Sequence, residues 1–376
     1  MRFFTSGNDL QGALSPLDLK HIKYLRYGLL CFGAWPGHLD DVPLRFISMF
    51  TKSYEMLLTD FITDLHLLNN KIKSDYSKKM NQFIHKLSHF FTIYTLILFV
   101  IAGITFNLGP LLLNIFNLNK KHKDPLSTNI TYKHAIYFAL PFDYEHNLTG
   151  CVVVYVINIY YSVTCAMVFT IYDLLIALVV FHLWGHIKIL IDNLENFPRP
   201  GFTGQGSNDT ASINRYTKED MPEVTKILRT LIKCHKFTIK YNNKISDSVG
   251  VNVAIYFTFH QISGCLLLLQ CSQLNIQNLI SFIPLTIGLS ELLVRMSVVF
   301  EVIKSMSDPL MRAAYNVPWE CMDVKNRKLV LMMLRMTQTP MGLKAMGMVD
   351  VGVQTMATIL KTTFSYYMML RALEKN

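Results

Sequence analysis

The chain has 376 residues, of which 51% are hydrophobic and only 16% are charged, and its formal net charge is +10. Soluble domains have roughly 25% charged residues, and a helix that crosses a bilayer needs about 20 mainly apolar ones. Asp, Glu, Lys and Arg are all absent from 87–119, 151–172 and 248–290. These stretches exclude an ordinary soluble enzyme, a secreted disulfide scaffold and a disordered chain.

Apolar stretches predict six membrane spans in chain order, the first of them weak because it contains charged residues: 43–69, 89–116, 150–182, 248–270, 279–303 and 349–372. The predicted fold is therefore an all-α polytopic membrane protein. Lys and Arg gather between the spans, which is typical of cytoplasmic loops. The other explanation of the positive charge, a basic patch that binds nucleic acid, does not account for this placement.

The charge pattern divides the chain into four parts. These are an N-terminal segment at 1–42, transmembrane helices at 43–303 with cytoplasmic loops at 70–88 and 184–247, a cytoplasmic segment at 304–348, and a last helix at 349–376 whose C-terminus lies outside. Asn129 and Asn147 begin glycosylation sequons in the segment that this topology places outside. A third sequon, at Asn208, lies in a predicted inside loop.

Two cytoplasmic stretches are predicted to be helical. In 217–241, Val224, Leu228 and Leu231 fall near one face, which indicates an amphipathic helix. A second helical pattern covers 326–336. Such helices can pack on one another beneath the membrane.

No constellation predicts catalysis, a metal site or a cofactor. The seven cysteines are scattered without a CxxC pair, the twelve histidines are dispersed, and HExxH, GxSxG and phosphate-loop motifs are absent. Cys151, Cys265 and Cys271 are expected near the outer face, as small apolar residues or as part of a disulfide. His260, alone in an apolar span, is interpreted as a core histidine.

Charged residues also lie within the more apolar predicted spans. Asp173 interrupts an apolar helix near its inner end, where an acid is either a hydrogen-bonded structural residue or a functional one. Glu291 and Arg295 are four residues apart with the acid first, the favoured order for a helical ion pair. We expect them to neutralise each other; a role in gating is the alternative.

The outer halves of the spans offer apolar and aromatic walls that suit a small hydrophobic ligand. Ordinary helix packing explains the same pattern, because small residues also concentrate at helix contacts. The candidate ligand-binding residues are Tyr54, Phe99, Ala102, Gly103, Phe106, Val156, Ile159, Tyr160, Val163, Phe282, Leu285 and Leu289.

The last span differs from the others because it contains Asp350, Lys361 and Arg371 together with several hydroxyl residues. A helix this polar should not face lipid. Its repeating stripe could line a pore with a hydrophobic constriction, and several copies around an axis would be needed to enclose one. The stripe consists of Thr362, Ser365, Met369 and Leu373 or Ala372.

Motifs in the C-terminal third resemble insect odorant receptors. They are Tyr-Asn-Val-Pro-Trp-Glu-Cys-Met-Asp at 315–323, Asn-Arg-Lys-Leu at 326–329, Gly-Leu-Lys-Ala at 342–345 and Leu-Lys-Thr-Thr-Phe-Ser-Tyr-Tyr-Met-Met-Leu at 360–370. The Trp-Glu-Cys-Met-Asp run is similar to receptors of sap-feeding insects such as aphids. Leu140-Pro-Phe-Asp143, Asp173 and His235 match a looser family pattern, and the resemblance covers about residues 70–376.

The resemblance implies a non-selective cation channel gated by a small hydrophobic volatile, in the plasma membrane of olfactory sensory neurons. It implies seven spans, so that the segment 1–42 is cytoplasmic, odorant-binding helices at 43–303, and cytoplasmic anchor helices at 304–348 that hold the subunits together. It also implies assembly of a tuning subunit with a shared co-receptor into a heterotetramer in the membrane lipid. The last span of each subunit would line the pore, with Met369 at the gate, Leu373 one turn outward and Tyr366 at the matching aromatic position. The odorant pocket would lie in the outer half of the second, third, fourth and sixth spans.

The chain departs from the family pattern in its first two spans. Family members have both spans before the position that corresponds to residue 71, and few residues are available for them here. The competing hypothesis is a seven-helix G-protein-coupled chemoreceptor. That class needs a cytoplasmic C-terminus, and the chain lacks DRY and NPxxY motifs. A secondary transporter is a third possibility, but no internal repeat supports it.

Overall fold

The computed structural model describes residues 13, 15–31, 48–69, 74–123, 131–200, 215–272, 276–347 and 349–374. Most of them are helical. The helices are α1 (Lys20–Cys31), α2 (Ser48–Asp60), α3 (Asp75–Lys123), α4 (Leu148–Glu195), α5 (Met221–Ser272), α6 (Ile276–Lys304), α7 (Ser307–Tyr315), α8 (Val324–Thr337) and α9 (Val353–Glu374). Short helical turns lie at η2 (Pro16–Asp18), η5 (Phe61–Leu65), η6 (Leu67–Asn69) and η7 (Trp319–Cys321), and two short strands at β1 (Lys344–Ala345) and β2 (Val349–Asp350).

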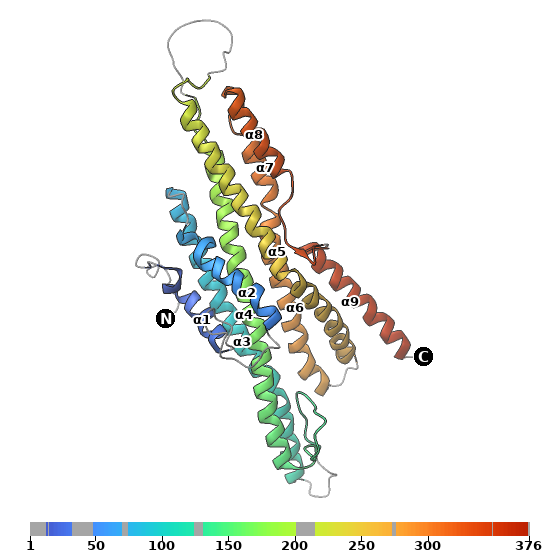
Figure 1. Ribbon diagram of the computed structural model, residues 1–376. Coiled ribbons are helices and arrows are strands. Elements are labelled where there is room, and N and C mark those ends of the chain that lie inside the picture. The colour runs from blue at the N-terminus through green and yellow to red at the C-terminus, as the bar shows by residue number, and fades with distance from the viewer. Residues whose placement is uncertain are drawn as a thin grey trace.

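The long helices run side by side in an elongated bundle (Figure 1). α3 and α4 pack along each other and extend past the other helices at one end, while α4, α5, α7 and α8 form the opposite end. Within the described residues, four helical stretches are long and apolar enough to cross a membrane: Asp75–Phe116, Leu148–Glu195, Met221–Ser272 and Phe282–Cys321. They confirm the all-α, polytopic prediction.

The helices continue well beyond the apolar windows that predicted them. α5 joins the predicted amphipathic helix and the predicted span 248–270 into a single helix, and α4 runs on to Glu195. Much of the segment 184–247, expected as a loop, is therefore helical. Backbone hydrogen bonds within a helix do not require apolar side chains, and the extension is stabilised because Val224 and Leu228 are buried in the core.

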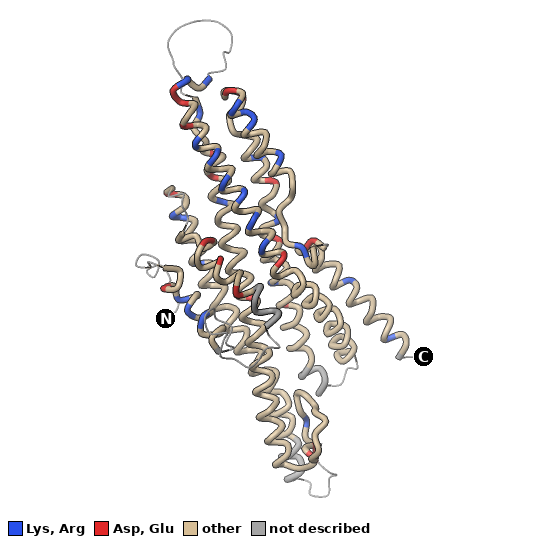
Figure 2. The backbone as a smooth tube through the Cα atoms, viewed as in Figure 1, with Lys and Arg blue, Asp and Glu red and all other residues tan. Residues whose placement is uncertain are grey.

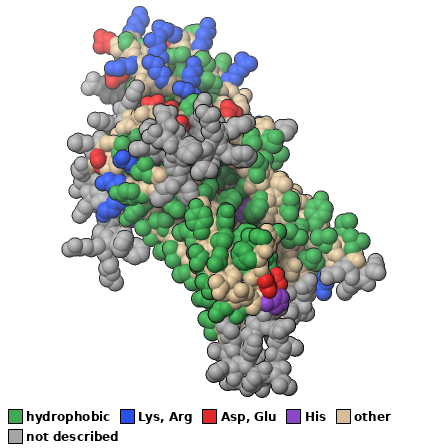
Figure 3. All heavy atoms as spheres, turned by 60° about the horizontal axis from the view of Figure 1, so that its bottom comes forward, with side chains coloured by type: hydrophobic (Ala, Val, Ile, Leu, Met, Phe, Trp, Pro, Cys, Tyr) green, Lys and Arg blue, Asp and Glu red, His purple; other side chains and the backbone are tan. Residues whose placement is uncertain are grey.

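Charge separates the two ends of the bundle. Lys and Arg side chains are concentrated over the first half of α5 and over α7 and α8, which we call the charged end, whereas the far lengths of α3 and α4 carry few charges (Figure 2). Hydrophobic side chains cover most of the described surface below the charged end (Figure 3). On α3, Ile97, Val100 and Ile104 are all more than half exposed, which suits a face in contact with lipid.

The weak first span is explained by partners on α5. Asp60 forms an ion pair with Lys244, and Tyr241 Oη donates to Asp64 Oδ2 at 3.0 Å. The acids that reduce the hydropathy of this segment therefore have partners inside the bundle. α1 and α2 contain only 12 and 13 residues, fewer than the about 20 that a crossing needs, although α2 continues directly into η5.

A short hairpin leads into the last helix. β1 pairs antiparallel with β2, with Lys344 opposite Asp350, and the turn between them has positive φ at Met346 (51°) and Gly347 (72°). The hairpin is fixed to α5 because Met346 N donates to Gly250 O at 3.2 Å. A Cβ at Gly250 would lie 2.7 Å from Lys344 O, so this contact requires glycine.

Candidate functional site

A cavity of about 370 Å³ lies between α3 and α4, in the part of the bundle away from the charged end. Its walls are mainly apolar. Val100 and Ile104, which line it, are also exposed on the side of the bundle, so the cavity opens to the lateral surface. The lining residues are Phe99, Val100, Gly103, Ile104, Asn107, Leu108, Tyr155, Ile159 and Val163. Size and lining suit a small apolar ligand.

Asn107 supplies the polar centre of this cavity. Its side chain is almost fully buried, and its Nδ2 donates to Ser162 Oγ on α4 at 2.9 Å and to Gly103 O at 2.8 Å. Tyr155 Oη donates to the backbone O of Asn107 at 3.4 Å. Neither Asn107 nor Tyr155 was among the predicted ligand-binding residues. The available signal was an amide within an otherwise apolar stretch, where polar groups are functional candidates.

Four of the predicted ligand-binding residues line the cavity: Phe99, Gly103, Ile159 and Val163. A Cβ added at Gly103 would meet no atom within 4 Å, so this glycine leaves the space open, as its small size suggested. Neighbours on the same helices, Ala102, Phe106, Val156 and Tyr160, do not line it; Val156 and Tyr160 are 60% and 67% exposed.

The other predicted ligand residues lie elsewhere. Phe282, Leu285 and Leu289 are on α6 and do not line the α3–α4 cavity. Tyr54 on α2 is buried; its Oη accepts a hydrogen bond from Asn252 Nδ2 at 2.6 Å, and its ring meets Tyr172 edge-on at 4.5 Å. Tyr54 therefore joins α2 to α4 and α5.

A second, larger hollow of about 770 Å³ lies among α3, α4 and α6, nearer the charged end. Its lining is aromatic and aliphatic apart from Ser290 and the ionic side chains Glu291 and Arg295. The residues are Phe83, Leu87, Phe91, Tyr94, Phe181, Trp184, Ile287, Ser290, Glu291, Val294, Arg295, Val298, Val299 and Val302.

Arg295 is the centre of an ionic network that joins three helices. Its Nε lies 3.3 Å from Glu291 Oε1 on α6, which confirms the pair expected from their spacing. Its Nη2 lies 3.1 Å from Asp173 Oδ2 on α4, and its Nη1 donates to Thr95 Oγ1 on α3 at 2.9 Å. Tyr94 Oη donates to Glu291 Oε1 at 3.0 Å. The acid that interrupts α4 therefore has a cationic partner.

α9 packs against α5 through one face only. Ile359, Thr363 and Tyr367 are buried, Gln261 Nε2 donates to Thr362 Oγ1 at 3.2 Å, and Cys265 Sγ donates to Thr363 O at 3.3 Å. Cys265 and the other predicted disulfide candidates, Cys151 and Cys271, are free thiols.

The remaining predicted pore residues lie on the uncovered side of α9. Tyr366, Met369 and Leu373 are 53%, 60% and 61% exposed, and Ser365 and Ala372 are exposed as well. Thr362 lies at the border with α5. The residues that would line a pore thus share a face that no described part of this chain covers.

Of the two predicted glycosylation sites, Asn147 is exposed at the start of α4. Its Oδ1 accepts from Thr149 N at 3.0 Å and caps that helix, which leaves Nδ2 free to carry a glycan. Asn129 lies outside the described residues.

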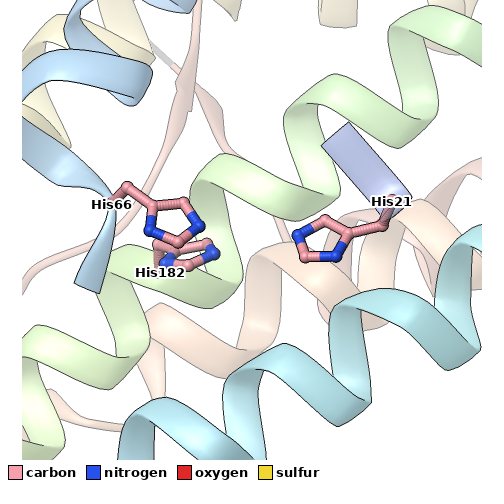
Figure 4. Close-up of side chains that lie close together, drawn as sticks. All are labelled: His21, His66 and His182. Carbon is pink, nitrogen blue, oxygen red and sulfur yellow. The ribbon is translucent and has the colours of Figure 1, made fainter. Parts of the chain in front are cut away.

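Three buried histidines converge although they are far apart in the sequence. His21 from α1, His66 after η5 and His182 from α4 face one another (Figure 4), with one ring nitrogen of each within 4.8 Å of the others. The His66 and His182 ring centroids are 4.1 Å apart. These histidines are dispersed in the sequence and were not predicted to form a group, because they come together only when η5 and α1 pack on α4.

The hydrogen bonds at these rings do not fit a metal ion. Leu67 N donates to His182 Nδ1 at 3.1 Å, and Leu68 N donates to His66 Nδ1 at 3.2 Å. An Nδ1 that accepts a hydrogen bond has its proton on Nε2 in the neutral ring. A metal-binding histidine instead offers a lone pair and donates its other N–H to an acceptor. This pair is therefore arranged to donate through Nε2.

Comparison with known proteins gives two findings. The family model described as "7tm Odorant receptor" matches residues 43–364. Two solved structures of the olfactory receptor OR5 of the insect Machilis hrabei share the fold. The structure in complex with eugenol has a TM-score of 0.66 and 12% identity, and covers 100% of this chain and 88% of that chain. The structure described without a ligand has a TM-score of 0.61 and 11% identity, with 98% and 95% covered. Among curated proteins, none matches.

Proposed function

The chain belongs to the 7tm odorant receptor family, and from this membership we propose that it is the odorant-tuning subunit of an odorant-gated, non-selective cation channel. As a family member it is a multi-pass membrane protein and an odorant receptor. The channel, its pore and its assembly with a co-receptor subunit into a heterotetramer are the proposed part.

The uncovered face of α9 is the observation that supports a channel most strongly. Ser365 and the half-exposed Thr362 give this face hydroxyl groups, and Met369 and Leu373 follow toward its C-terminal end. Lipid offers no hydrogen-bond partners to such a helix. Copies of α9 from several subunits, arranged around an axis, would place the hydroxyls along a water-filled path and Met369 at a hydrophobic constriction.

We propose that the odorant binds in the α3–α4 cavity. The related Machilis hrabei receptor has been solved in complex with eugenol, and the cavity here has apolar walls around a single amide centre. A volatile of about ten to fifteen non-hydrogen atoms held mainly by apolar contacts should bind with about −8 kcal/mol, which is micromolar affinity. Binding gates only if the open state holds the odorant more tightly than the closed state does.

The charged end is proposed to lie in the cytoplasm, since Lys and Arg mark that side. The C-terminus of α9 points away from the charged end (Figure 1) and would then lie outside. The segment 131–147 would lie on the same side. The membrane of olfactory sensory neurons is the expected location.

The test is to express the chain with an odorant co-receptor and to record currents against a panel of eugenol, geraniol, benzaldehyde, hexyl acetate and 1-octanol. At least one volatile should evoke a non-selective cation current that requires both subunits. Responses that need a G protein and persist without the co-receptor would instead support a seven-helix G-protein-coupled receptor. An epitope placed after Asn376 separates these alternatives independently, because only the channel topology makes it accessible on intact cells.

A further inference from the structure

The last helix begins without a capping side chain of its own. Val353 is its first residue and Gly352 precedes it. The first N–H groups of a helix have no intrahelical partner, and a serine or aspartate before the helix usually supplies one. Glycine has no side chain that can do this.

A carboxylate from another helix takes that role. Oε2 of Glu301, near the end of α6, accepts a hydrogen bond from Val353 N at 3.1 Å. Glu301 thus caps a helix that starts 52 residues later in the chain. Its negative charge lies at the positive end of the α9 dipole, which strengthens the contact.

Gly352, the residue before α9, leaves the space that the Glu301 carboxylate occupies. A Cβ at Gly352 would lie 2.3 Å from Glu301 Oε2, so any side chain there would displace the carboxylate. Gly352 is buried, and its own carbonyl begins the helix by accepting from Met356 N at 3.1 Å. The glycine therefore leaves the helix start intact and makes room for a partner from α6.

Glu301 lies on the same helix as Arg295, which is bound to α3 and α4. Through Arg295, α6 is therefore bound to the helices of the proposed odorant cavity. Through Glu301, the same helix accepts a hydrogen bond from the first N–H of the proposed pore helix. The contacts of α5 with α9, at Thr362 and Thr363, lie further along the helix.

We propose that the Glu301 carboxylate is a positioning residue through which α6 sets the start of α9 and thereby couples odorant binding to the gate. The inference rests on the proposed channel function. A movement of α6 relative to α3 and α4 is passed to α9 at this hydrogen bond, and one of the two gating states holds the bond better than the other.

Two substitutions remove the bond from opposite sides. Glu301→Ala removes the acceptor. Val353→Pro removes only the donor, because proline is favoured at the first position of a helix and the bond from Met356 N to Gly352 O does not involve residue 353. Glu301→Gln keeps an acceptor oxygen, and Glu320→Ala, at an exposed carboxylate of the charged end, serves as the control.

Each variant is expressed with the co-receptor, and the half-maximal concentration of the most active panel volatile and the basal current are measured per channel at the cell surface. Glu301→Ala and Val353→Pro should each shift the half-maximal concentration in the same direction by about tenfold, the size expected for loss of a cap. The double variant should shift it no further, because both changes break one bond. Glu301→Gln should recover part of the shift, and Glu320→Ala should change nothing.

Additive shifts in the double variant, or unchanged half-maximal concentrations with the complex at the surface, would overturn the inference. A purely structural role would lower the surface amount without moving the half-maximal concentration. If the wild-type complex passes no volatile-evoked current, the proposed function fails. The bond is then judged by amide exchange at the start of α9 in the purified chain, which Glu301→Ala should accelerate; unchanged exchange contradicts the bond itself.

Discussion

Arg295 Nη2 lies 3.1 Å from Asp173 Oδ2, and the two side chains are only 7% and 5% exposed. The pair links α6 to α4, and Thr95 extends it to α3. In an apolar surrounding, each charge is tolerated because the other is present. One guanidinium group therefore joins all three helices.

Removing one partner should be more damaging than removing both. Arg295→Met leaves Asp173 buried without its cation and should destabilise the fold by about 3–5 kcal/mol. The paired change of Arg295→Met with Asp173→Leu should recover much of that loss, because no fully buried charge is left unpaired. Glu291 also loses its cation, but it is 27% exposed and keeps the hydrogen bond from Tyr94 Oη. Thermal unfolding of the purified protein in detergent measures both effects. Equal losses in the single and paired variants would show that the ion pair is not the cause.

Filling the α3–α4 cavity should lower the odorant potency. Gly103→Phe puts a ring into space that is now open, and we expect at least about a tenfold loss of potency with normal surface amount. Gly103→Ala should have a small effect. The matched control is Gly109→Phe on the same helix: its Cβ also meets nothing within 4 Å, and Gly109 does not line the cavity. Equal losses at Gly109 would place the ligand elsewhere.

Shortening the proposed gate residue should make the channel leak. Met369→Ala widens a hydrophobic constriction, so we expect a larger basal current or altered ion permeation. Met368→Ala is the control, since Met368 is exposed to a similar degree, 50% against 60%, but points about 100° around the helix. Unchanged currents for Met369→Ala in complexes confirmed at the surface would contradict its role as gate.

The glycosylation site at Asn147 tests the topology. Thr149→Ala destroys the sequon but keeps the Asn147 cap on α4, so it should remove a glycosidase-sensitive shift on a gel without loss of stability. Asn147→Gln should remove the same shift and also cost about 1 kcal/mol through the lost cap. The proposed orientation is contradicted if neither sequon, at Asn129 or Asn147, carries a glycan in a cell that glycosylates a control receptor.

The histidine group predicts an absence of metal dependence. Because His66 and His182 accept backbone hydrogen bonds at Nδ1, a cation at Nε2 would require those bonds to break. Zinc in slight excess, or a chelator, should leave the unfolding temperature of the purified protein unchanged. A zinc-dependent rise that is lost in His21→Ala would show that the protons are placed differently.

The sequence predicted the parts of the fold that depend on local composition. The apolar windows located α3, α4, α5 and α6 because each window is longer than a bilayer crossing. The spacing of Glu291 and Arg295 predicted their ion pair, since residues four apart share a helix face. Gly103 was identified because a small residue among aromatic ones leaves room.

What the sequence did not reveal depends on contacts between distant segments. The cavity lies between α3 and α4, whereas the candidate residues on α6 and α2 looked equally suitable. Periodicity predicts which side chains share a helix face, but it does not predict which helix packs against that face. Asp60 made the first span look weak, since its partner Lys244 lies 184 positions later. The cap from Glu301 to Val353 has no local pattern at all.

α5 is one helix of 52 residues, and at 1.5 Å per residue it is about 78 Å long. It touches α2 and α4, holds the hairpin at Gly250 and packs against α9 near Thr363. A rigid rod of this length that tilts by about 2° at one end sweeps about 3 Å at the other. Small forces applied at the charged end would therefore act with leverage on the proposed pore helix, so that regulation at that end needs no contact with the proposed ligand.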